Sequence, residues 1–267
     1  MSEPHLRAVV SEVRGLVHAV RAEFRPVRAG RVVVSGMLAE QLAKELGRQA
    51  QPGAVEVGGD AVPEDTDVLV RVIAGDPSSA DDALIRAADA RGLPTVVVQL
   101  WPQADWTRPF VLTPYVVECQ AGHGFPLREI AVQIVEADEN GPQLASRVPA
   151  LRDAAAYDIV RRAVVRSAIL GLLGARAGAA RTLLSLDQVR MLGRLDTAAG
   201  GRAAAAGPRA LAGGVAVAVA TGFVFRRLAR GMRDVVPAPV ANAAIAAAGT
   251  WALAKAAHEL RGRFPAE

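Results

Sequence analysis

The amino-acid sequence predicts a two-domain protein: an α/β domain with a mainly parallel sheet, followed by an all-α helical domain with apolar helices. Short apolar runs alternate with helical patterns up to about residue 140, and only helical patterns follow residue 150. Charge divides the 267-residue chain at the same place. Up to Ala150 there are 14 Lys and Arg against 20 Asp and Glu, and after it 17 against 7. We expect a leading segment 1–28 and domains at 29–140 and 150–264.

The leading segment, residues 1–28, has an amphipathic pattern. Its apolar side chains recur at the spacing of one helical face: Leu6, Val9, Val10, Val13, Leu16, Val17, Val20 and Phe24. Arg7, Glu12 and Arg14 interrupt the uncharged stretch that a signal peptide requires. We therefore expect an amphipathic helix that packs on the neighbouring domain or on a second copy of the chain. Binding at a membrane surface is the alternative.

The first domain, residues 29–140, alternates its elements as a parallel α/β domain requires, with helices on both faces of the sheet. Apolar runs of strand length occupy 31–35, 54–57, 67–74, 95–100 and 115–119. Helical patterns occupy 37–48, 79–91 and 127–137. Ser79 is expected to cap the helix at 79–91, because Asp81 and Asp82 then fall in a first turn where the helix dipole favours anions.

The second domain is expected to be helical throughout, after a Pro- and Gly-containing linker at 139–149. Its helical stretches are 151–173, 184–198, 210–230 and 240–261. Two of them carry uncharged runs, Ala210–Phe225 and Val235–Ala254. A bilayer requires about 20 apolar residues per helix, and Ala and Gly add little to insertion. The runs are therefore marginal membrane spans, and helices that dip into the membrane without crossing it are the alternative.

The sequence contains no recognisable constellation of catalytic residues. A phosphate-binding loop that starts at Gly36 would need Gly, Lys and then Ser or Thr where Gln41, Leu42 and Ala43 stand. The single Cys119 excludes an intrachain disulfide, and four scattered His residues add no metal-ligand spacing. We expect no cofactor and no metal ion, and a reducing compartment for the first domain.

The ends of the strands supply one candidate site, because ligands of open α/β sheets bind outside the carboxyl ends of the strands. The residues that the sequence places there are Ser35, Gly36, Asp76, Trp101 and His123. They form a candidate ligand pocket in which His123 is the side chain suited to proton transfer near neutral pH. Turn formation and helix capping are the simpler explanation of the same residue types.

Basic residues of the second domain supply a second candidate site. The cluster between the two uncharged runs consists of Arg226, Arg227, Arg230 and Arg233. Arginines beside an apolar helix are typical of contact with anionic membrane lipid, and a solvated helix end is the alternative. The long apolar runs favour lipid over nucleic acid as the partner of this basic half. Asp187 and Arg190 are expected to form a local ion pair at a helix surface.

The middle of the first domain resembles a small Era-type GTPase. The resemblance rests on the strand at 67–76, the helix at 81–91 and the strand at 92–99. Gln99-Leu100-Trp101-Pro102 stands where such GTPases have the guanine-reading Asn-Lys-x-Asp motif, and 116–124 stands where they have the Ser-Ala-Lys loop. The resemblance implies a GTPase-like (Rossmann-like) sheet that lacks a P-loop and has lost the nucleotide chemistry.

The second half, residues 151–262, resembles the uncharacterised bacterial membrane family typified by YcjF, the domain of unknown function 697. Leu184–Met191 and Val240–Ala254 carry this resemblance. Members are often attached to GTPases or encoded near them, so the resemblance implies a GTPase or other protein partner. Residues Ala175–Thr182 depart from the family, which has a Pro- and Gly-containing acidic loop there.

These observations together predict a non-enzymatic, membrane-associated docking or regulatory protein. Its pseudo-GTPase-like domain would lie in the cytosol and its helical domain at the cytoplasmic membrane. A soluble nucleotide-dependent enzyme or GTPase with an atypical phosphate site is the alternative. A channel- or transporter-like homo-oligomer built from the apolar helices is a third hypothesis.

Overall fold

The computed structural model describes residues 30–59, 61–102, 113–173, 180–200 and 237–263. They divide into two compact units, and each is treated by itself. The α/β unit comprises Arg28–Asp158 with Thr197–Gly200, and the helical unit contains Ile159–Asp196 and the C-terminal helix. The predicted segment 1–28 and the predicted helix at 210–230 lie outside the described residues.

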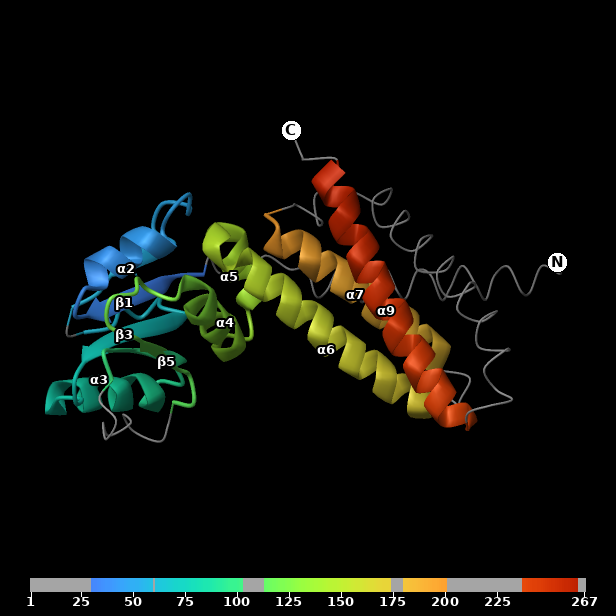
Figure 1. The fold of residues 1–267 in the computed structure, drawn as a ribbon, viewed down its shortest axis with the longest axis horizontal. Helices are drawn as coiled ribbons and strands as arrows, with labels where there is room; N and C mark the ends of the chain where they lie inside the picture. Colours follow the sequence, from blue (N-terminus) through green and yellow to red (C-terminus); the bar gives the residue numbers. More distant parts are fainter. Residues whose placement is uncertain (1–29, 60, 103–112, 174–179, 201–236, 264–267) are drawn as a thin grey trace. The chain divides into compact units, whose positions relative to one another are not determined.

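Five strands form the sheet of the α/β unit (Figure 1), in the order β2-β1-β3-β4-β5. The strands are β1 Val32–Gly36, β2 Val55–Val57, β3 Val68–Ala74, β4 Thr95–Leu100 and β5 Val116–Cys119. Every neighbouring pair runs parallel. The predicted α/β class with a parallel sheet is therefore confirmed, whereas the likeness to a GTPase stays a prediction.

Helices cover both faces of the sheet. Helix α2 (Ala39–Leu46) and helix α3 (Ser79–Ala90) lie on opposite faces (Figure 1), because right-handed crossovers leave the centre of the sheet in opposite directions. The core under α3 consists of alternate strand residues and two turns of the helix: Val33, Leu69, Ile73, Leu84, Ile85, Ala88 and Val97. Helix α4 (Leu127–Ala137) packs against β3, β4 and β5.

Helix α3 is capped by Ser78, so the predicted cap at Ser79 is wrong. The Ser78 hydroxyl accepts a hydrogen bond from the Asp81 backbone N–H at 3.2 Å, and an Asp81 carboxylate oxygen accepts one from the Ser78 backbone N–H at 2.8 Å. This reciprocal box needs a separation of three residues. The residue three positions after Ser79 is Asp82, and Asp82 takes no part in the capping box of this helix.

The predicted linker at 139–149 is wrong as well, because helix α5 (Gly141–Arg147) and a short 3₁₀ turn, η1 (Pro149–Leu151), occupy it. Pro142 lies in the first turn of α5, where a missing backbone N–H costs no hydrogen bond. Leu144 and Ala145 are fully buried. Burial of these apolar side chains outweighs the turn-forming tendency of the flanking Gly and Pro.

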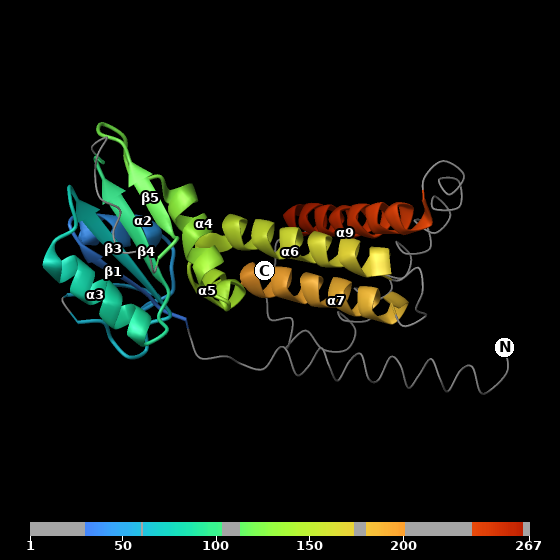
Figure 2. The same cartoon turned by 90° about the horizontal axis from the view of Figure 1, so that it is seen from below.

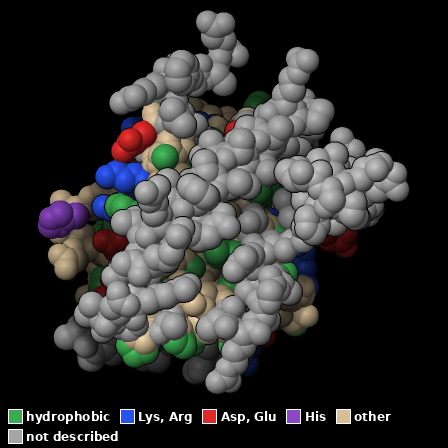
Figure 3. All heavy atoms as spheres, turned by 90° about the vertical axis from the view of Figure 1, so that its right-hand side faces the viewer, with side chains coloured by type: hydrophobic (Ala, Val, Ile, Leu, Met, Phe, Trp, Pro, Cys, Tyr) green, Lys and Arg blue, Asp and Glu red, His purple; other side chains and the backbone are tan. Residues whose placement is uncertain are grey.

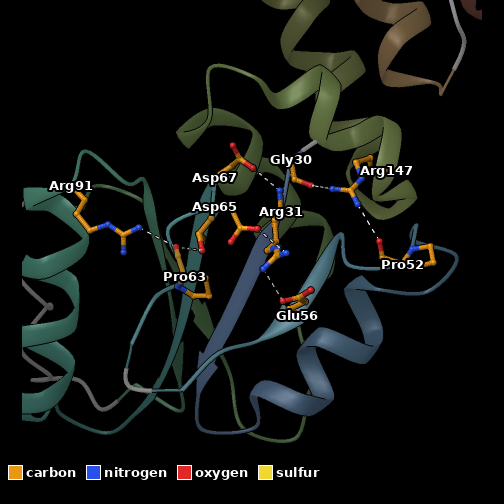
Figure 4. Close-up of polar contacts among 10 residues, drawn as sticks. Gly30, Arg31, Pro52, Glu56, Pro63, Asp65, Asp67, Arg91 and Arg147 are labelled. Carbon is orange, nitrogen blue, oxygen red and sulfur yellow. Dashed lines mark hydrogen bonds and ion pairs between the residues drawn. The ribbon is translucent and has the colours of Figure 1, made fainter. Parts of the chain in front are cut away.

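Two arginines form hydrogen bonds and ion pairs at the amino edge of the sheet (Figure 4). The partners of Arg31 are Asp67 through the backbone N–H (2.6 Å), and Asp65 (2.8 Å) and Glu56 (3.1 Å) through the guanidinium. The guanidinium of Arg147, at the end of α5, donates to the backbone carbonyl of Gly30. The chain therefore enters β1 beside α5.

The helical unit contains the greater part of α6 (Arg152–Leu173), of α7 (Ala180–Ala198) and all of α9 (Ala238–Arg263), drawn in yellow, orange and red in Figure 2. The predicted helices at 151–173, 184–198 and 240–261 are thus confirmed, although α7 begins four residues earlier. Each helix contributes one buried polar side chain to a layer in which the Thr250 hydroxyl donates to Ser167 at 2.8 Å and accepts from Gln188 at 3.4 Å.

No helix among the described residues is both long enough and apolar enough to cross a bilayer. The predicted membrane span at Val235–Ala254 is therefore not supported for the part that lies in α9, which includes the polar residues Asn242 and Thr250. The predicted run Ala210–Phe225 lies outside the described residues.

Candidate functional site

The carboxyl edge of the sheet has its topological switch point between β1 and β3, because the chain passes from β1 to β2 on one side and from β3 to β4 on the other. Ser35 and Gly36 lie at the end of β1, and Gly75 and Asp76 follow β3. Trp101 follows β4, and His123 lies in the loop after β5. The structure thus brings the predicted pocket residues to one edge of the sheet.

Ser35 is not available at this edge. Its side chain is buried and accepts a hydrogen bond from the Arg71 guanidinium at 3.3 Å. The same guanidinium forms two contacts to one carboxylate oxygen of Asp81, at 2.8 and 2.6 Å. Ser78 donates to the other oxygen through its hydroxyl at 2.6 Å and its backbone N–H at 2.8 Å. The polar groups of this cluster therefore satisfy one another and leave none directed at a ligand.

The protonation state of Asp81 fits this closed cluster. Burial by itself would raise the pKa of the Asp81 carboxyl. The hydrogen bonds from Ser78 and the neighbouring Arg71 charge outweigh burial, so that the pKa lies below its ordinary value. Asp81 is thus a charged partner of Arg71 at neutral pH and is unsuited to act as a general acid.

The switch point itself is closed by backbone. Gly36 has a φ of +96°, and a Cβ atom there would overlap the carbonyl oxygen of Val72. The Met37 N–H donates to that same oxygen at 3.1 Å. β1 and β3 therefore stay hydrogen-bonded one residue beyond Gly36, where the mouth of a switch-point crevice would lie.

The start of α2 is also unfavourable for phosphate. Leu38 occupies the N-cap position in a left-handed conformation and provides no side-chain hydrogen bond. Glu40 lies in the first turn of the helix. A carboxylate there competes with any anion for the positive end of the helix dipole.

Of the exposed apolar residues of this edge, the sequence reasoning named only Trp101 and missed Met37, Leu38 and Val57. Across the described residues 30–151, the large apolar side chains that are exposed are Met37 (52%), Leu38 (44%), Val57 (52%) and Trp101 (49%). All four lie at or directly after the carboxyl ends of β1, β2 and β4. We call them the apolar edge. The sequence shows single apolar residues after strands, and only the parallel pairing brings them to one edge.

Two residues of the apolar edge have strained backbones. Leu38 has a φ of 56° and Trp101 a φ of 49°. A left-handed conformation costs a residue with a side chain roughly 1–3 kcal/mol and tends to occur where function requires it. The strain is partly offset at Trp101, whose backbone N–H donates to the carbonyl of Cys119 at 2.8 Å.

Asp76, Trp101 and His123, the other predicted pocket residues that carry side chains, are exposed. His123 contacts the Ala121 carbonyl of its own loop at 3.4 Å, and Asp76 lies at the turn that follows β3. Gln99, at the end of β4, is fully buried and donates to the Gly75 carbonyl at 2.6 Å. Its other side-chain atom, Oε1, has no hydrogen-bond partner. These residues do not assemble a nucleophile, a base and an oxyanion site.

In the helical unit, Asp187 does not lie at a helix surface, where its ion pair with Arg190 was predicted. It is buried, and one carboxylate oxygen accepts a hydrogen bond from Arg166 of α6 at 3.1 Å. Burial raises the pKa of Asp187, against the lowering effect of Arg166, Arg190 and Arg194. The predicted lipid contacts of residues 226–233 lie outside the described residues. No group of three or more metal-ligating side chains occurs within the described ranges.

Comparisons with protein-family models, curated proteins and solved structures gave no match to this chain. The two family resemblances of the sequence therefore stay predictions.

Proposed function

We propose that this chain is a non-enzymatic docking protein that associates with the cytoplasmic membrane. Its α/β unit would bind a protein partner through the apolar edge, and its helical half would contact anionic lipid. The observation that carries the proposal is the composition of the switch point, where exposed Met37 and Leu38 stand beside a polar cluster that is satisfied internally.

The chemistry of the apolar edge favours a protein over a small polar ligand. Four large apolar side chains are about half exposed, and a partner that removes them from water lowers the free energy of the complex. Aromatic and Met side chains, such as Trp101 and Met37, are enriched in the cores of protein interfaces. A GTPase is the partner class that the resemblance of the second half implies.

The docking proposal is tested at Leu38. A photo-crosslinking amino acid at position 38 of the full chain should capture a discrete partner, and the same group at exposed Glu64, before β3 at the opposite edge, should not. The identified partner is then purified and titrated. We expect Leu38→Asp to weaken binding at least tenfold, and Val240→Asp, an equal change at an exposed site of α9, to leave it unchanged. Equal binding by both variants would refute the proposal.

The alternative, a nucleotide-dependent enzyme, is decided by calorimetric titration of the full chain with GTP and GDP and by a phosphate-release assay. We expect neither saturable binding at millimolar nucleotide nor turnover, because the switch point is closed and Glu40 repels phosphate. Saturable binding with turnover would replace the docking proposal with the enzyme.

A further inference from the structure

Helix α6 carries an apolar stripe that nothing among the described residues covers. Val165, Ile169 and Leu172 are exposed by 54, 50 and 50%. Separations of four and three residues place them on one side of the helix. We call these three residues the α6 stripe. Hydrophobic side chains at the surface of the described part of the chain are visible in Figure 3.

The other side of α6 faces its own unit. Ala163 and Ser167 are buried, and Ser167 bonds Thr250 of α9 in the polar layer. At 100° per residue, the centre of the α6 stripe lies roughly opposite Ser167. The stripe is therefore directed away from α9, and a further apolar element is needed to shield it from water.

The leading segment of this chain has a pattern that matches the α6 stripe. Going back along the chain, Val13 lies three residues before Leu16, and Val9 lies four residues before Val13. Read antiparallel to α6, they fall opposite Val165, Ile169 and Leu172 within one residue. Residues 6–24 in helical form measure about 28 Å, and α6 measures about 33 Å at 1.5 Å per residue.

The leading segment also joins the described chain next to the start of α6. Gly30 is held by the Arg147 guanidinium and lies against Leu144, to whose Cδ1 atom a Cβ on Gly30 would come within 3.1 Å. Arg147 ends α5, and α6 begins five residues later at Arg152. Gly30 therefore lies beside the end of α5 (Figure 4), five residues before α6 begins.

We propose that residues 6–24 form an amphipathic helix that packs antiparallel along the α6 stripe of the same chain. Leu16, Val13 and Val9 would cover Val165, Ile169 and Leu172, while Arg7, Glu12 and Arg14 remain in water. The stripe is then the docking surface for an intramolecular helix, and a second copy of the chain or a lipid surface are the competing occupants.

Cysteine crosslinking in the full-length protein tests this arrangement. The native Cys119 is buried and its pKa is raised to about 11, chiefly by burial, so its thiol does not compete with engineered thiols. The test pair is Val13→Cys with Ile169→Cys. The control pair is Ser11→Cys with Ile169→Cys, which moves the first thiol to the opposite side of the predicted helix. We expect an intramolecular disulfide in the test pair that forms at least tenfold faster than in the control.

Three results would overturn the proposal. A disulfide found in a dimer would assign the stripe to a second copy of the chain. Crosslinking only after addition of phosphatidylglycerol-containing vesicles would show that the chain does not have this docking by itself. Equal rates for the two pairs would mean that the segment does not dock on α6.

Hydrogen exchange on the otherwise unmodified chain gives a second readout that needs no engineered thiols. We expect the amides of residues 9–20 to be protected, and Ile169→Asp to accelerate their exchange at least tenfold. Val240→Asp introduces the same charge at a site of α9 that is exposed by 53% and should leave that exchange unaltered. Identical exchange in the two variants would contradict the proposal.

Discussion

Asp138 lies between α4 and α5, and its carboxyl group is buried where a negative charge is unfavourable. It follows the last residue of α4, and one carboxylate oxygen accepts a hydrogen bond from the Asn140 N–H at 2.9 Å, just before α5 begins. The other oxygen is buried and has no hydrogen-bond partner. The pKa of Asp138 is raised to about 6, chiefly by burial; the hydrogen bond from Asn140 opposes this rise, and the charges of Asp67 and Glu139 contribute to it.

We expect Asp138→Asn to stabilise the protein above pH 6. The pKa of about 6 in the folded state exceeds the unfolded value near 4. The wild-type protein therefore has the full contribution of the protonated group below about pH 4 and loses it as the pH rises through 6. Asn keeps the acceptor for Asn140 and removes the buried charge. Urea denaturation should show a gain of about 1–3 kcal/mol at pH 7.5 and little gain at pH 4.

The control for this prediction is Asp89→Asn, an amide substitution at an exposed residue of α3. It should leave the difference in stability between the two pH values as it is in the wild-type protein. A gain from Asp138→Asn that is equal at both pH values would contradict the assignment of the effect to the buried charge.

At the scale of elements, α6 and α9 approach each other so closely that only glycine fits at the contact. A Cβ atom on Gly171 would lie 2.6 Å from the carbonyl oxygen of Asn242 and 2.9 Å from the Cα atom of Ala243. Both neighbours are backbone atoms and cannot turn aside as a side chain does. The hydrogen bond between Ser167 and Thr250 joins the same two helices, so a shift at Gly171 would strain that bond as well.

We expect Gly171→Ala to destabilise the helical unit, although alanine has the higher helix propensity by about 1 kcal/mol. Separating the two backbones enough to accept a methyl group is expected to cost about 1–3 kcal/mol more than that gain. Thermal unfolding followed by circular dichroism should show a lower midpoint. The matched change Gly124→Ala, where a Cβ would meet no atom within 4 Å, should leave the midpoint nearly unaltered. An unchanged midpoint for Gly171→Ala would contradict the close approach.

For the whole molecule, the division of charge is the property that bears on its partners. The second half has an excess of Lys and Arg over Asp and Glu, and the first half the reverse. A cluster of arginines near a surface with anionic lipid contributes about 1 kcal/mol for each charge. The proposed membrane association therefore depends on the second half and should weaken with salt.

We expect the full chain to sediment with vesicles that contain phosphatidylglycerol and to remain in the supernatant with neutral phosphatidylcholine vesicles. Replacing Arg226, Arg227, Arg230 and Arg233 together by Gln should weaken the sedimentation at least tenfold. Arg48→Gln, in the α/β unit, should have no effect. Equal sedimentation with both kinds of vesicle would exclude an electrostatic contact with lipid.

Local patterns in the chain predicted most of the elements. The strand at Thr95–Leu100 and the helix at Leu127–Ala137 were predicted to the residue, because an apolar run of strand length and an amphipathic pattern of period 3.6 can both be read from neighbouring positions. The segment 139–149 was mistaken for a linker because the burial of Leu144 depends on residues that are distant in the chain, such as Gly30. The collection of Ser35, Gly36, Asp76, Trp101 and His123 at one edge followed from parallel pairing alone.

The sequence by itself determined the α/β class, the position of the elements and the absence of a standard phosphate-loop motif. Only the tertiary structure decided what each candidate residue can do. Ser35 is joined to Arg71, 36 positions away, and Asp187 to Arg166, 21 positions away. No local pattern encodes such pairs, because the energy of a buried polar group depends on partners that folding brings from distant parts of the chain.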